Sequence, residues 1–146
     1  MIARRLTLIA LAAAGAFAST ACTMDKSSSS MMSTAMTVPL SGRNEVPPNA
    51  SGGSGTSKVE LDGNVLKWTV SYQGTTGPVT AGHFHGPAPA SANAGVVIPF
   101  SGSMASPITG SATLTPAQVA DLKAGLYYIN LHTAANPGGE LRGQVR

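Results

Sequence analysis

The chain contains three histidines, and two of them, His83 and His85, are separated by a single residue. In a β-strand, residues two apart point to the same face, with Cα atoms roughly 6–7 Å apart. Such a pair predicts two imidazole ligands on one strand face, and imidazole suits copper and zinc. A metal site needs at least one more ligand, and His132 is the only imidazole left. The structural alternative is that His83 and His85 hydrogen-bond the Gly86-Pro87 loop and hold its shape.

The segments on either side of residues 134–138 read as a closing hairpin. Tyr127, Ile129 and Leu131 alternate with Tyr128, Asn130 and His132, and Leu141, Gly143 and Val145 alternate with Glu140, Arg142 and Gln144. Matching apolar to apolar residues puts Leu131 and Leu141 in the core. The same matching puts His132 on the outer face, together with Asn130 and Arg142.

The same rule places Phe84 in the core and His83 and His85 on the opposite face. If the strand that carries His83 lies beside the closing hairpin, His83, His85 and His132 are expected to form one metal site. Arg142 is expected to guide an anion toward the open coordination position of that site.

Few other residues are suited to catalysis. Nothing resembles a hydrolase, because the serine-rich stretch lies outside the expected domain, where no base can be held. Glu140 and Arg142 lie two apart on one strand face, where we expect a solvated cross-strand contact. Arg43 and Glu45 flank the Pro47-Pro48 turn and are expected to fix the N-terminal strand. These patterns favour a binding protein over an enzyme.

Short runs of β-branched residues between glycines and prolines indicate many strands with tight turns. The expected strands are 37–42, 55–61, 65–72, 78–86, 95–100, 108–114, 126–133 and 139–145. Asp62-Gly63 predicts a hairpin turn, because primed turns need positive φ. Thr115-Pro116-Ala117-Gln118 predicts a capping box that opens a short helix over 116–124, closed by Gly125. Seven or eight strands with one short helix predict an all-β sandwich or barrel.

Residues 1–21 read as a signal peptide, with Arg4 and Arg5 before an apolar stretch too short to span a membrane. Cys22 is the only cysteine and directly follows Ser19-Thr20-Ala21, so this junction resembles a bacterial lipobox, in which the cysteine is lipidated. Residues 22–36 are expected to form a lipidated, serine-rich tether. The alternative is ordinary cleavage near Ala18 or Ala21. The lipoprotein hypothesis predicts an extracytoplasmic protein of the bacterial cell envelope, facing the periplasm from the outer membrane in a Gram-negative cell.

The charge of the chain excludes one class of partner. The net charge is +3, but Arg4 and Arg5 leave with the signal peptide, so nine basic side chains become seven against six acidic ones. The remaining basic residues are scattered along the sequence, which is not the footprint of a nucleic-acid-binding protein. The expected partners are the membrane through a lipid anchor, a metal ion, and a protein or a glycan.

Five motifs then occur in a recognisable order. They are Glu45-Val46-Pro47-Pro48, His83-Phe84-His85-Gly86-Pro87, Leu114-Thr115 before the helix, Tyr128-Ile129-Asn130-Leu131-His132-Thr133 and Gly139-Glu140-Leu141-Arg142-Gly143. Together they closely resemble the CHRD domain, the module first described in chordin and found widely in bacterial secreted proteins. The resemblance runs from about residue 38 to 145 and implies a CHRD domain over 37–146. It also implies a barrel-like topology in which the strand of His83 lies near the closing hairpin that carries His132. It supports a metal-binding lipoprotein and a non-catalytic adhesion or partner-binding module equally.

A looser similarity connects His83, His85, His132 and Arg142 with the copper-zinc superoxide dismutases, which carry an H-x-H pair, a later histidine and an arginine in this order. It implies a Greek-key β-barrel and favours copper, with zinc as second choice. The chain departs from that family because it lacks histidines for the bridging and zinc positions and a cysteine pair. A dismutase-like copper redox enzyme is therefore the alternative function, behind the two non-catalytic ones.

Overall fold

A computed structural model describes residues 33–146 of the protein. The expected signal peptide (1–21), Cys22 and the expected tether up to residue 32 lie outside the described residues. The elements are β1 (Thr34–Ser41), a 3-10 turn η1 (Gly42–Asn44), β2 (Ser54–Asp62), β3 (Val65–Gln73), β4 (Val79–His85), β5 (Val96–Pro99), β6 (Ile108–Thr113), α1 (Pro116–Lys123), β7 (Tyr127–Thr133) and β8 (Leu141–Val145). The strands and the helix agree closely with those predicted. The first strand begins at Thr34, so the last residues of the expected tether belong to the sheet.

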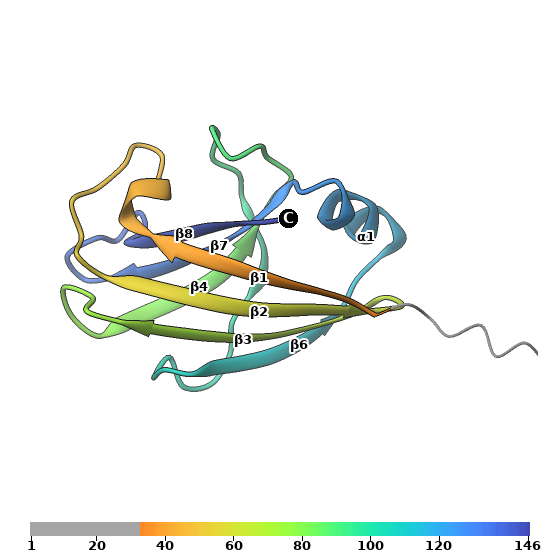
Figure 1. The fold of residues 1–146 in the computed structure, drawn as a ribbon, viewed down its shortest axis with the longest axis horizontal. Coiled ribbons are helices and arrows are strands. Elements are labelled where there is room, and N and C mark those ends of the chain that lie inside the picture. The colour runs from red at the N-terminus through yellow and green to blue at the C-terminus, as the bar shows by residue number, and fades with distance from the viewer. Residues whose placement is uncertain (1–32) are drawn as a thin grey trace, which may run out of the picture.

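The eight strands form one antiparallel sheet in the order β5-β4-β7-β8-β1-β2-β3-β6 (Figure 1). The sheet curls into a nearly closed barrel in which β5 and β6 are the two edges. After β5 and β6 the chain returns through α1, and β7 then pairs with β4, which is a Greek-key connection. The predicted all-β architecture of seven or eight strands with one short helix is confirmed.

Local turn and cap chemistry explains the element boundaries. Gly63 closes the β2–β3 hairpin with a φ of 60°, a conformation that costs glycine little. Thr115 caps α1 through the Gln118 backbone N–H, and the Gln118 side chain accepts from the Thr115 N–H, which completes the predicted capping box. Gly125 follows the helix with a φ of 71°. Among residues 33–146, no helix is long and apolar enough to cross a membrane.

The inner face of the barrel is the hydrophobic core. Phe84 is fully buried and makes edge-to-face contacts with Trp68 and Phe100, at ring-centroid distances of 5.2 and 5.5 Å. Leu131 pairs with Leu141 in the register of β7 and β8, and both side chains are buried. The core positions predicted from strand alternation are therefore confirmed at Phe84, Leu131 and Leu141.

The outer face of β7 and β8 is also buried, which the sequence did not predict. Tyr128 and Asn130 on β7 and Arg142 on β8 lie under other parts of the chain. Asn44 donates to the Arg142 carbonyl, and Asn93 donates to the Val46 carbonyl, so the segments 42–53 and 86–95 lie together over this face. The prediction that this face is open to solvent is wrong, because long loops cover it.

Candidate metal centre

The pairing of β4 with β7 gathers the three histidines. Their register pairs His83 with Asn130, His85 with Tyr128 and Ala81 with His132. One ring nitrogen from each histidine lies within 4.8 Å of the others. His83 contacts both neighbours, with ring centroids 5.4 Å from His85 and 4.9 Å from His132. Residues far apart in sequence thus form one cluster, as predicted.

Backbone carbonyls set the tautomers of two of the rings. The Nδ1 atom of His85 lies 3.0 Å from the Ala94 carbonyl oxygen, and Nδ1 of His132 lies 3.0 Å from that of Pro137. A carbonyl can only accept, so each Nδ1 carries the proton and donates it. Each neutral ring then keeps its lone pair on Nε2, and such hydrogen bonds are the usual outer support of metal-binding histidines.

The remaining ring nitrogens of His83 and His132 lie close together. Nδ1 of His83 lies 3.1 Å from Nε2 of His132, where either a proton or a shared cation must separate two nitrogen acceptors. Nε2 of His85 is buried and has no hydrogen-bond partner among the described residues. A water molecule does not reach this atom, but a bare metal ion is smaller than water. The donor set therefore fits a metal ion.

The distances between the ring nitrogens can be compared with those around a bound metal ion. Ligand nitrogens at 2.0–2.1 Å from a tetrahedral metal lie roughly 3.3 Å apart. The His83–His132 separation of 3.1 Å is close to this value. The ligand nitrogens of the three rings lie within 4.8 Å of one another, and this upper limit exceeds roughly 3.3 Å. Metal binding must therefore draw at least one ring inward.

The electrostatic environment keeps the three rings neutral. Burial is the largest cause that lowers the pKa of His83, His85 and His132 below the ordinary value. For His83, the neighbouring His132 and His85 lower the pKa further. Neutral imidazole is the form that binds metals, so the site holds its ligands in the competent state.

Arg142 does not touch the histidines, and Tyr128 stands between them. The His85 ring stacks on Tyr128 at a centroid distance of 4.9 Å, and the Arg142 guanidinium carbon lies 3.6 Å from the centroid of the Tyr128 ring. Arg142 is 1 % exposed and donates to the Asn93 side chain and the Ala92 carbonyl, both at 2.7 Å. Its role as a guide for anions stays a prediction.

The sequence analysis did not identify the residues that hold the histidine rings in place. The Tyr128 hydroxyl accepts from the Ala94 N–H at 3.0 Å, so Tyr128 and Arg142 both hold the loop whose Ala94 carbonyl orients His85. Tyr128 was detectable, because it lies on the same strand face as His132 by the period of two. The carbonyls of Ala94 and Pro137 carry no sequence signal.

Two buried carboxyl groups, Glu45 and Glu140, accept hydrogen bonds from side chains of β7. Glu45 accepts a 2.7 Å hydrogen bond from the Asn130 side chain, and burial raises its pKa to about 7. Glu140 is 0 % exposed, so the expected solvated contact with Arg142 is wrong. Hydroxyl and backbone donors of Ser51, Thr76 and Thr133 surround it and hold its pKa at about 2, against the opposing effect of burial.

Comparison with known families gives one result. The CHRD domain model matches residues 36–145, which is most of the chain, and the protein belongs to the CHRD domain family. No curated protein and no solved structure was found to match the chain. The looser similarity to the copper-zinc superoxide dismutases stays a prediction.

Proposed function

We propose that this CHRD-domain protein is a non-catalytic binding module that is anchored to the extracytoplasmic side of a bacterial membrane and binds copper through His83, His85 and His132. Zinc is the second choice of metal. The observation that carries the proposal is the donor set. The Ala94 and Pro137 carbonyls orient His85 and His132 so that each keeps its lone pair on Nε2, Nδ1 of His83 lies 3.1 Å from Nε2 of His132, and Nε2 of His85 is buried without a hydrogen-bond partner among the described residues.

The chemistry of the ligands favours copper. Imidazole binds both copper and zinc, and copper stands highest in the affinity order of the divalent first-row metals. The full chain has three histidines, so it offers no imidazoles for a second metal beside the first. This argues for binding rather than for the dismutase-like redox chemistry that remains the alternative.

Calorimetric titration of copper into apo protein tests the metal site. Wild type should bind one copper ion per chain at neutral pH. Loss of an outer-shell partner alone costs about 10–100-fold in metal affinity. His83→Ala and His132→Ala should therefore each weaken binding by at least that factor, and by similar amounts.

Lys67→Ala is the matched control, because Lys67 is exposed on β3, which pairs with neither β4 nor β7. It should bind copper like wild type. If wild type takes up no copper, or if His132→Ala binds as tightly as wild type, the three histidines do not form one site. If the copper-loaded protein consumes superoxide, the dismutase-like alternative function is favoured over a non-catalytic binding module.

Membrane fractionation tests the anchor. Cys22 is the only cysteine and follows three small or hydroxylated residues. Cys22→Ala should move the protein from the detergent phase to the soluble extracytoplasmic fraction. Unchanged partitioning of the variant would exclude lipidation at Cys22.

A further inference from the structure

The strands β1 and β8 are neighbours in the sheet but pair over a very short length. β1 pairs with β2 along its whole length, whereas its only pair with β8 is Ser41 with Arg142. Figure 1 shows the two strands together near Ser41 and separating toward the start of β1. Most of one edge of β1 therefore lacks a strand partner.

Pro39 identifies which backbone groups face this edge. Proline has no N–H, so a strand accepts it where the nitrogen points away from the neighbouring strand. A Cβ atom built on Gly143 would lie 2.5 Å from the Pro39 carbonyl oxygen, which shows that Pro39 faces β8 rather than β2. Since this orientation repeats every second residue, Thr37 and Ala35 present their N–H and C=O groups to the same open edge.

Two hollows follow the split between the strands. The first, of about 510 Å³, is lined by residues of β1, β8 and their flanking loops, including Thr37, Pro39 and Gln144. The second, of about 530 Å³, shares Ala90, Gln144 and Arg146 with the first and adds apolar side chains, among them Leu122 and Leu126. Together they form one groove, which we call the β1–β8 groove.

The groove concentrates the positive charge of the domain. Its lining contains all three arginines of residues 33–146, Arg43, Arg142 and Arg146, and Lys123 as well. Its one side-chain carboxyl group is Glu45, which is only partly ionised near neutral pH because burial raises its pKa to about 7. The field in the groove therefore favours an anionic ligand.

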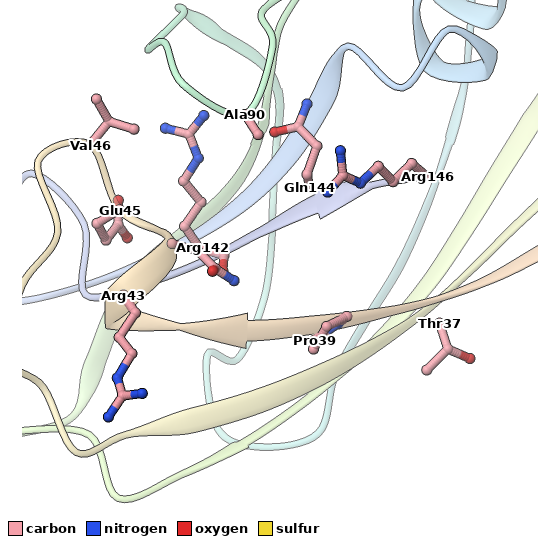
Figure 2. Close-up of a pocket in the computed structure, with 10 residues that line it drawn as sticks. Thr37, Pro39, Arg43, Glu45, Val46, Ala90, Arg142, Gln144 and Arg146 are labelled. Carbon is pink, nitrogen blue, oxygen red and sulfur yellow. The ribbon is translucent and has the colours of Figure 1, made fainter.

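Side chains on β8 and directly after it form one wall of the β1–β8 groove. Figure 2 shows Arg142 and Gln144 on β8 and Arg146 directly after it, with Arg43 turned away from Arg142. Arg142 is nearly fully buried and bonded to loop oxygens, so it contributes charge rather than contact. Arg146 is exposed and free to contact a ligand directly.

We propose that the β1–β8 groove binds an extended peptide segment of a partner protein, with acidic and apolar residues in alternation, as an added strand on the open edge of β1. Peptides that add to a sheet edge gain affinity from main-chain hydrogen bonds and specificity from pockets for alternate side chains. The open edge supplies the main-chain groups, and the cationic and apolar hollows supply the pockets. The groove involves β1 and β8, whereas the histidines lie on β4 and β7.

Selection of a random seven-residue peptide library against the full chain in detergent tests the proposal. Enriched sequences should alternate acidic and apolar residues. The best peptide should bind Arg146→Gln at least fivefold more weakly than wild type. Arg43→Gln should cause a smaller loss of affinity than Arg146→Gln. Lys67→Gln, an exposed charge on β3, and His83→Ala should bind it like wild type.

Strand addition has its own signature. Methylation of alternate backbone nitrogens of the peptide should abolish binding, and the bound peptide should protect the amide of Thr37 from hydrogen exchange. Thr37→Pro should also abolish binding, and the methylated peptide gives the same information if that variant does not fold. The proposal is overturned if the library yields no acidic sequence, or if the best peptide binds Arg146→Gln as tightly as wild type. It is also overturned, in favour of an acidic glycan, if the protein binds trigalacturonate and no peptide.

Discussion

Glu45 and Glu140 are both buried on the same outer side of the sheet, yet their pKa values are shifted in opposite directions. Glu140 is the more completely buried, at 0 % exposure against 7 % for Glu45. Burial alone would raise both pKa values, but the pKa of Glu140 falls to about 2 while that of Glu45 rises to about 7. At Glu140 the hydrogen-bond donors outweigh burial, whereas at Glu45 burial outweighs the hydrogen bond from Asn130, because burial disfavours a charge only where hydrogen bonds do not replace water.

The donors themselves come from different places. Glu140 accepts from the Ser51 and Thr133 hydroxyls and from both the hydroxyl and the backbone N–H of Thr76. It thus ties three separate segments of the chain to the start of β8. Glu45 has the Asn130 amide as its one side-chain donor, with Arg142 adding a weaker electrostatic attraction. Glu140 is a structural anchor, and Glu45 is a titratable group.

Glu140→Gln should have the largest effect. The amide removes the charge and turns one of the oxygens into a donor that faces other donors. Hydrogen bonds to a charged group contribute about 1.5–3 kcal/mol each to stability, so the free energy of unfolding should fall by about 3 kcal/mol. Urea denaturation at pH 7 measures the change. Glu60→Gln, at an exposed carboxylate on β2, is the control and should change stability by less than about 0.5 kcal/mol.

The stability of the wild type should depend on pH in two opposite ways. Between about pH 2 and 4.5 the unfolded chain binds the proton of Glu140 more tightly, so stability rises with pH. Between 4.5 and about 7 the folded chain holds the proton of Glu45 more tightly, which makes stability fall with pH. The three histidines act in the opposite sense as the pH rises toward 6.5, because burial lowers their pKa values in the folded chain. The Glu45 contribution is at most about 3 kcal/mol, at 1.36 kcal/mol per pKa unit. The difference in stability between wild type and Glu45→Gln measures it, because both proteins carry the histidines. Stability that does not rise between about pH 2 and 4.5 would contradict the assignment of Glu140 as an ionised anchor.

Glu45→Gln should isolate the Glu45 contribution. The neutral amide resembles the protonated acid, so the variant and the wild type should be equally stable near pH 4.5. Above pH 7 the variant should be the more stable by about 1–2 kcal/mol, because it avoids a poorly solvated charge. Thermal unfolding of both proteins at pH 4.5 and 8 measures this. Equal stability at pH 8 would mean that Glu45 is ionised there at no cost.

Ser51→Ala should have the smallest effect. It removes one donor from Glu140 and leaves those of Thr76 and Thr133 in place. A loss of about 1 kcal/mol is expected, since the carboxylate keeps most of its partners. Carbon NMR of the Glu140 side chain should show a slightly raised pKa, still well below 4.5. A loss as large as that of Glu140→Gln would show that the Ser51 hydroxyl alone holds the anchor.

In the cluster of three histidines, too, local sequence patterns explain one part of the arrangement and contacts between distant segments explain the other. The H-x-H spacing is enough to place His83 and His85 on one strand face. The apolar matching of Leu131 with Leu141 is enough to place His132 on the outer face of β7. Neither pattern states that β4 pairs with β7, which the resemblance to the CHRD family implied and the register of the two strands shows.

The sequence by itself determined the strands, the Asp62-Gly63 hairpin, the capped helix and the inward positions of Phe84, Leu131 and Leu141. These features are local, since strand alternation, turn glycines and caps act over a few residues. Only the tertiary structure decided that loops cover the outer face of β7 and β8, that the pKa of Glu140 is lowered while that of Glu45 is raised, and that the Ala94 and Pro137 carbonyls orient two histidines. Those outcomes depend on backbone groups and loops brought together from distant parts of the chain, and such contacts have no period along the sequence.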